Sequence, residues 1–149
     1  MVAAIYGEGI EERSATFRTD LPAPAEMASA IDSPATRLAL VAEDDEGVGA
    51  FALVVPYSAN PAYRGVGEYM IYVARRARRR GMGRELLEAT CRRARADGHW
   101  KLVGKLFPSN QPSIALALAC GFREVGVHER HGQLEGQWRD VLLVERRLD

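Results

Sequence analysis

The sequence predicts a single α/β domain of three layers, in which a mixed, partly antiparallel sheet carries helices on both faces. Two apolar runs, 37–43 and 48–55, flank a polar turn that ends in Gly47, which is typical of an antiparallel hairpin. A third run, 68–74, leads through a glycine-containing turn into an amphipathic segment. With 47% apolar residues, a chain of 149 residues can bury one core. Residues 1–149 are therefore expected to form one domain.

Helices and further strands are expected on both sides of this turn. A first helix over 2–8 is expected to stop near Gly7 and Gly9, and the others are expected over 22–31, from Met82 to the Asp97-Gly98 pair, and over 113–120 before Gly121. Strands are expected over 101–107, 122–129 and 141–147, with 132–137 connecting the last two. The order of elements excludes a doubly wound parallel sheet.

The turn after the third apolar run reads Arg78-Arg79-Arg80-Gly81-Met82-Gly83-Arg84. A strand that turns through glycines into a helix leaves backbone N–H groups unpaired at the positive end of the helix dipole, which favours anion binding. Gly81 and Gly83 carry no Cβ to hold a phosphate away, and arginines offer forked donors suited to a diphosphate. A run of arginines is also typical of a solvated face or a nucleic-acid patch, here Arg75 to Arg84.

Composition limits the other classes of function. Lys plus Arg and Asp plus Glu both number 20, so a nucleic-acid binder driven by overall charge is not expected. Cys91 and Cys120 lack metal-ligand spacing and are expected in the core, and no metal site is predicted. The sequence shows neither a secretion signal nor an apolar run long enough to span a membrane, so a cytoplasmic location is expected.

Two motifs resemble those of one superfamily. Arg78-x-x-Gly81-x-Gly83 is similar to the acetyl-coenzyme A signature of the GCN5-related N-acetyltransferases (GNAT), and Asn110-x-x-Ser113 followed by Gly121-Phe122 is similar to their second signature. Within this superfamily the chain resembles the phosphinothricin N-acetyltransferases and their arsinothricin-resistance branch. The resemblance extends over Ala15-Thr16-Phe17, Pro61-Ala62-Tyr63, Phe107-Pro108-x-Asn110, Arg130-His131-Gly132 and Gly136-x-Trp138-Arg139-Asp140, among others. It implies the GNAT fold, whose first strand, of the form Ile-Arg-x-Ala, is not found before the first helix here.

The resemblance implies an enzyme that transfers the acetyl group of acetyl-CoA to the amine of a small amino-acid-like substrate, with Glu68 as the general base. Without this resemblance, Glu68 would be interpreted as a strand-end glutamate that only pairs with an arginine. The implied acetyl-CoA-binding residues are Tyr72, Val73, Ala74, Arg78, Arg79, Arg80, Gly81, Met82, Gly83, Arg84, Asn110 and Ser113. Ala117 stands where many relatives place a tyrosine that protonates the leaving thiolate, so water would serve or no acid would be needed.

A substrate with a phosphinate-like or arsenate-like group needs cationic and aromatic contacts. The expected substrate-binding residues are Thr16, Phe17, Tyr63 and Arg64, with Trp138 and Asp140 contributing from the same chain or across a dimer. Structural roles are equally expected for three of them: Phe17 in the core, Arg64 as a loop charge and Trp138 in packing. Methionine sulfoximine or sulfone, another small amine and a peptide N-terminus remain alternative substrates. A homodimer is implied only by the resemblance.

Overall fold

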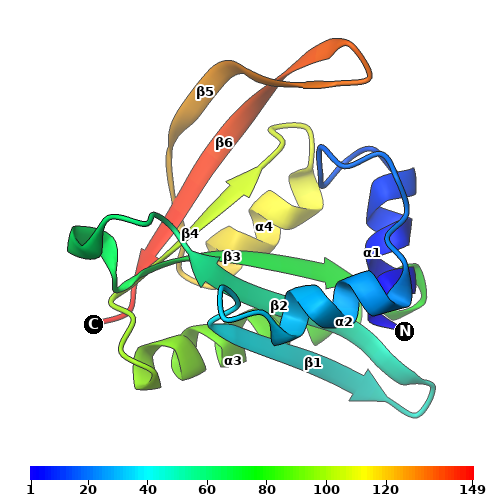
Figure 1. The fold of residues 1–149 in the computed structure, drawn as a ribbon, viewed down its shortest axis with the longest axis horizontal. Helices are drawn as coiled ribbons and strands as arrows, with labels where there is room; N and C mark the ends of the chain where they lie inside the picture. The colour runs from blue at the N-terminus through cyan, green and yellow to red at the C-terminus, as the bar shows by residue number, and fades with distance from the viewer.

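The computed structural model describes all of residues 1–149 as one sheet of six strands with four α-helices (Figure 1). The elements are α1 (Val2–Glu11), α2 (Pro24–Asp32), β1 (Leu38–Asp44), β2 (Gly47–Pro56), β3 (Val66–Val73), α3 (Met82–Ala96), β4 (Lys101–Leu106), α4 (Gln111–Ala119), β5 (Arg123–Leu134) and β6 (Gln137–Arg147). Short 3₁₀ turns lie at Pro61–Tyr63 and Arg75–Ala77. No helix has both the length and the apolar character needed to cross a bilayer.

The sheet is mixed and mostly antiparallel, as the sequence predicts. Its strand order is β1-β2-β3-β4-β6-β5, and only β3 and β4 run parallel. The hairpin β1–β2 closes with Asp44 opposite Gly47, whose φ of +101° explains why glycine ends this turn. β6 therefore lies between β4 and β5, and the β5–β6 hairpin extends away from the body of the domain (Figure 1).

Helices cover both faces of the sheet, which confirms the expected three layers. Side chains alternate along β2: Ala50 and Ala52 pack with Leu86 of α3, whereas Phe51 and Leu53 pack with the side of α1 and α2. The apolar runs thus have two buried faces, which accounts for the nearly continuous apolar sequence of β2.

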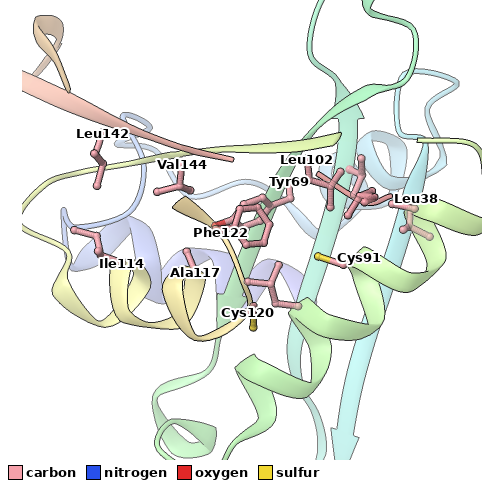
Figure 2. Close-up of a cluster of buried hydrophobic side chains, with 14 residues drawn as sticks. Leu38, Tyr69, Cys91, Leu102, Ile114, Ala117, Cys120, Phe122, Leu142 and Val144 are labelled. Carbon is pink, nitrogen blue, oxygen red and sulfur yellow. The ribbon is translucent and has the colours of Figure 1, made fainter. Parts of the chain in front are cut away.

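The largest core cluster lies between the sheet and the helices α3 and α4 (Figure 2). Cys91 and Cys120 are both buried there as free thiols, which confirms their prediction as core residues. Burial raises the pKa of Cys91 to about 11, so this thiol stays protonated and unreactive at neutral pH.

The first helix differs from the prediction because its glycines do not end it. α1 continues through Gly7 and Gly9 to Glu11. Both glycines are buried: a Cβ on Gly9 would lie 3.1 Å from the Tyr72 ring, and one on Gly7 would lie 3.1 Å from the Leu21 side chain. The glycines therefore allow close packing of α1, which outweighs their low helix propensity.

The closing hairpin also differs from the prediction. Residues 132–137 were expected to connect the last strands, but β5 and β6 continue through most of this segment and only Glu135 and Gly136 form the turn. Both turn residues have positive φ, +52° and +76°, which is the conformation of a tight two-residue hairpin. Polar sequence suggested a loop there, whereas pairing with β6 makes it a strand.

Candidate active site

The strands β3 and β4 separate partway along the sheet. Their parallel pairing covers only Val66–Glu68 against Lys101–Val103, although β3 continues to Val73. The N–H of Ala74 donates to Gly49 O on the β2 side at 2.8 Å, so by alternation the polar groups of Val73 point toward the opening. The two strands therefore splay apart beside Val73. The N–H of Ala74, which was expected among the acetyl-CoA-binding residues, is already used within the sheet.

The glycine turn leads into α3 at the wide end of this opening. Gly81 is the N-cap of α3 with φ +83°, and no side chain caps the helix, so the N–H groups of its first turn are left for an external acceptor. A Cβ on Gly81 would have no atom within 4 Å, which shows that the space beside the turn is open. Gly83 instead packs closely, since its Cβ would lie 3.3 Å from Val73 and 3.4 Å from Leu116.

The arginines of the turn are used unequally. Arg78 donates to both carboxylate oxygens of Glu12, at 2.9 and 3.1 Å, and its Nε donates to Val73 O at 3.1 Å. Arg84 pairs with Glu88 at 3.3 Å. Arg79 and Arg80 form no ion pair, and Arg79 has φ +62°. Arg79 and Arg80 are therefore the unpaired arginines of the turn. Arg79 lines the cavity beside the turn, whereas Arg80 does not.

The two arginines that precede the turn are also paired. Arg75 contacts Glu11 at 3.1 Å and Glu12 at 2.8 Å, and Arg76 contacts Asp44 at 2.8 Å. Burial works to raise the pKa of Glu12, but the hydrogen bonds from Arg78 and Arg75 outweigh it and hold that pKa below its usual value. The Arg75 pairs join the end of α1 to the segment before the turn, and the Arg76 pair joins that segment to the end of β1. All of these pairs reduce the free charge of the arginine run.

A groove of about 570 Å³ connects these features. It is lined by the end of α1 and the loop after it, the open edge of β3, the glycine turn and the start of α4; the lining residues include Gly9, Glu12, Ser14, Ala15, Ile71, Tyr72, Val73, Arg78, Arg79, Gly81, Gly83, Arg84, Asn110, Ser113 and Leu116. Its volume lies within the range of small-molecule and cofactor sites. An unpaired strand edge followed by an uncapped helix start fits an amide-bearing chain that ends in a diphosphate.

Three further residues expected at the cofactor site have structural contacts. The Asn110 amide accepts from Ser113 N–H at 3.2 Å and donates to Ser14 O at 3.0 Å, so it caps α4 and ties that helix to the loop after α1. The Tyr72 ring stacks on Phe51 with centroids 5.3 Å apart, and Met82 packs against Gly49. Of the Asn110–Ser113 pair, only the Ser113 hydroxyl has no protein partner at the groove.

Glu68 lies at the point where β3 and β4 part. It lines a smaller pocket of about 60 Å³ together with Tyr72, Asn110 and Ser113, which also line the larger groove. Its Oε2 is 3.0 Å from Nζ of Lys105 on β4. The sequence analysis did not identify Lys105 as a site residue. The feature that could have indicated it is a lysine inside a mostly apolar strand. The alternative interpretation, in which Glu68 only pairs with an arginine, is not found: the ion-pair partner of Glu68 is Lys105.

Two of the expected substrate residues lie beside this pocket. Phe17 packs edge-on against Phe107 with ring centroids 4.9 Å apart, and Phe107 lines the pocket with Glu68. The Thr16 hydroxyl hydrogen-bonds Tyr6 OH at 3.2 Å and accepts from Arg18 N–H at 3.2 Å. Both residues belong to the segment that follows α1, next to Ala15 in the pocket wall.

The other four are not brought to either cavity within one chain. Tyr63 packs against Tyr57, and the Arg64 guanidinium lies 5.3 Å from the centre of the Trp100 ring. On the β5–β6 hairpin, Trp138 is 52% exposed beneath the Arg130 guanidinium, and Asp140 accepts from Arg130 N–H at 2.7 Å. Their expected substrate contacts would need loop movement or a second subunit. No cluster of three or more His, Cys, Asp or Glu side chains is arranged to hold a metal ion.

A mixed sheet that splays beside an uncapped, glycine-started helix defines an acyltransferase that takes its acyl group from a coenzyme A thioester. A family model described as "Acetyltransferase (GNAT) family" matches residues 6–122. The chain belongs to the GNAT family of acetyltransferases, and acetyl-CoA is its acetyl donor.

Relatives of known name support this assignment. The chain is 32% identical to a phosphinothricin N-acetyltransferase of Alcaligenes faecalis, over 99% of this chain and 77% of that protein. It is 34% identical to an L-methionine sulfoximine/L-methionine sulfone acetyltransferase of Pseudomonas paraeruginosa, over 74% and 64% of the two chains. A solved phosphinothricin acetyltransferase from Sinorhizobium meliloti, in complex with acetyl-CoA, superimposes with a TM-score of 0.86 at 31% identity, covering 99% of this chain and 85% of that one.

Proposed function

We propose that this enzyme acetylates the amino group of a small amino-acid-like substrate of the phosphinothricin or arsinothricin type and thereby confers resistance to such an antimetabolite. The observation that carries the proposal is the position of Glu68, at the point where β3 and β4 part and the groove meets the smaller pocket. The relatives are named as acetyltransferases of phosphinothricin and of methionine sulfoximine or sulfone. A cytoplasmic enzyme would meet both acetyl-CoA and the antimetabolite.

The chemistry requires alignment more than strong base catalysis. Bound acetyl-CoA supplies a thioester that is already activated, so the chain must hold the amine in line and accept one proton. At pH 7 the α-amino group of an amino acid is mostly protonated, so it must lose a proton to a base or to water before its nitrogen attacks the thioester. Glu68 accepts the proton directly or through water, and Lys105 holds its carboxylate at the pocket.

The main chain of β3 supplies the electrostatic part of the proposal. The Val73 N–H points into the opening and polarises the thioester carbonyl, while the first turn of α3 after Gly81 binds the diphosphate with Arg79 and Arg80. Ala117, four residues after Ser113, is buried and offers no proton. The thiolate therefore leaves unassisted or takes a proton from water.

Phe17 and Thr16 are proposed to line the amine site, because their segment adjoins the pocket wall. Tyr63 and Arg64 are proposed to join them from the loop before β3. Trp138 and Asp140 lie on the protruding hairpin, so their contribution is proposed to come from the other subunit of a homodimer.

Two alternatives stay open. Acetylation of methionine sulfoximine or sulfone is favoured by the similarity to the Pseudomonas paraeruginosa enzyme, and acetylation of another small amine or of a peptide N-terminus needs the same groove. A non-catalytic nucleic-acid-binding or regulatory role would use the patch Arg75 to Arg84, but only two of its arginines, Arg79 and Arg80, are not already paired with carboxylates.

A panel assay separates these candidates. Release of free coenzyme A thiol is followed with phosphinothricin, arsinothricin, methionine sulfoximine and a short peptide as acceptors. The highest kcat/KM is expected for phosphinothricin or arsinothricin. A preference for methionine sulfoximine or the peptide would replace the proposed substrate. A nucleic-acid shift at moderate salt without any thiol release would overturn the proposal.

A further inference from the structure

Arg139 of β6 has no anionic partner. Its Nε is the only buried side-chain nitrogen or oxygen in the chain without a hydrogen-bond partner, and its guanidinium forms no ion pair. The guanidinium lies 5.6 Å from the centre of the Phe107 ring, which holds it in a cation–π contact. The Nη nitrogens of the same guanidinium also form no hydrogen bond, but they are not buried, so they are free to bind an external anion.

Strand alternation places Arg139 on the same face of the sheet as the Glu68 pocket. Lys105 of β4 is opposite Leu143 of β6, and side chains of β6 alternate, so Leu143, Val141 and Arg139 face the side on which Lys105 meets Glu68. Phe107, two residues after Lys105, lines the pocket on this side. The Arg139 guanidinium therefore lies against the Phe107 ring, next to the pocket that Phe107 lines.

The residues around Arg139 pack closely together. Gly132 is opposite Arg139 in the β5–β6 ladder, and a Cβ on Gly132 would lie 2.7 Å from the Phe17 ring. Phe17 in turn packs edge-on against Phe107. The two aromatic rings and the guanidinium form one group, in which Arg139 is the only member with a charge.

We infer that Arg139 is a specificity-determining residue that binds the anionic group at the end of the substrate away from its amine. The inference rests on the proposed function and deepens it, because it assigns the substrate class to amino acids with a second acidic group. A guanidinium offers parallel N–H donors that match two oxygens of a phosphinate, arsonate or carboxylate. Glu68 and Arg139 lie near opposite sides of Phe107. Glu68 would accept the proton of the substrate's amine, and Arg139 would bind the acidic group of the same molecule.

The test compares substrates with and without the second acid. Phosphinothricin and methionine sulfone both carry an α-amino acid end, but only phosphinothricin has an anionic side chain. Arg139→Met is expected to lower kcat/KM for phosphinothricin roughly 10- to 100-fold, the worth of a charge-assisted hydrogen bond, and to change that for methionine sulfone less than about threefold. Arg139→Lys is expected to recover part of the loss.

The control is Arg92→Met on α3, because this arginine is exposed, forms no ion pair and lines neither cavity. It is expected to leave both substrates unaffected. Equal losses on both substrates, or no loss on phosphinothricin, would overturn the role of Arg139. If the unaltered enzyme acetylates neither compound, the proposed function fails; calorimetric titration of phosphinothricin with coenzyme A present then decides on Arg139 separately. Weaker binding to Arg139→Met alone supports the inference, and equal or absent binding in both proteins overturns it.

Discussion

The Arg78 guanidinium spans the cofactor groove from Val73 O to both carboxylate oxygens of Glu12. In this position it occupies a main-chain acceptor on the open edge of β3, and its charge is balanced by Glu12 rather than left for a diphosphate. The pair thus connects α1 to the glycine turn at the groove proposed to bind acetyl-CoA.

Glu12→Gln is expected to tighten acetyl-CoA binding about two- to fivefold, because it removes a negative charge from the groove and frees Arg78. Glu11→Gln is the matched control, since Glu11 pairs with Arg75 and does not line the groove. Titration calorimetry measures both affinities. Weaker binding in Glu12→Gln would show that Arg78 must be held by Glu12 to accept the cofactor.

Glu68→Gln is expected to lower kcat roughly 10- to 100-fold and to leave the Kd of acetyl-CoA unchanged, because a base assists a reaction that positioning already favours. The exposed Glu43 on β1 forms no ion pair, so Glu43→Gln serves as the control. Thiol-release kinetics and calorimetry are the measurements. Unchanged kcat in Glu68→Gln would remove Glu68 from the proton transfer.

Gly81→Asp is expected to weaken acetyl-CoA binding more than about tenfold, because a carboxylate would face the diphosphate beside the uncapped start of α3. Gly81→Asn has nearly the same size, and asparagine tolerates the positive φ of this position, so it is expected to bind within about threefold of the unaltered enzyme. Equal affinities of the two variants in calorimetry would place the diphosphate elsewhere.

Gly132→Ala is expected to cost about 1–3 kcal/mol in the free energy of unfolding and to raise KM for the amine, because its Cβ would lie 2.7 Å from the Phe17 ring. Gly126→Ala on the same strand meets no atom within 4 Å and is expected to stay within about 0.5 kcal/mol. Denaturant unfolding and steady-state kinetics check the pair. A Gly132→Ala protein with unchanged KM would place the amine away from Phe17.

Glu145 links β4 and β5 through Lys101 at 2.8 Å and Arg123 at 2.6 Å. The hydrogen bond from Lys101, followed by that from Arg123, holds the pKa of Glu145 below its usual value although burial opposes this. The resulting stability is present above the unfolded pKa and is lost as pH falls through the folded pKa. Glu145→Gln is therefore expected to lower stability by about 1 kcal/mol at pH 7 and by progressively less under acid, in unfolding curves measured from pH 7 to pH 3.

The local sequence predicted the parts of this protein that depend on neighbouring residues. Gly47 marks a hairpin and Gly81 marks a helix start after a strand, because both positions need positive φ. The position of Glu68 at a strand start is also local. The prediction that α1 ends near Gly7 and Gly9 was wrong. These glycines let α1 pack closely against other segments, and helix propensity does not describe such contacts.

Contacts between distant segments could be known only from the fold. Glu12 and Arg78 are 66 residues apart, and Lys105 meets Glu68 because β4 is the parallel neighbour of β3. Alternation along a strand predicts which of its residues share a face of the sheet. It does not predict which other strand lies beside that strand. The electrostatics of the site, including the unpaired Arg139, therefore arise from tertiary structure, because charge pairing falls off with distance in space and is indifferent to distance along the chain.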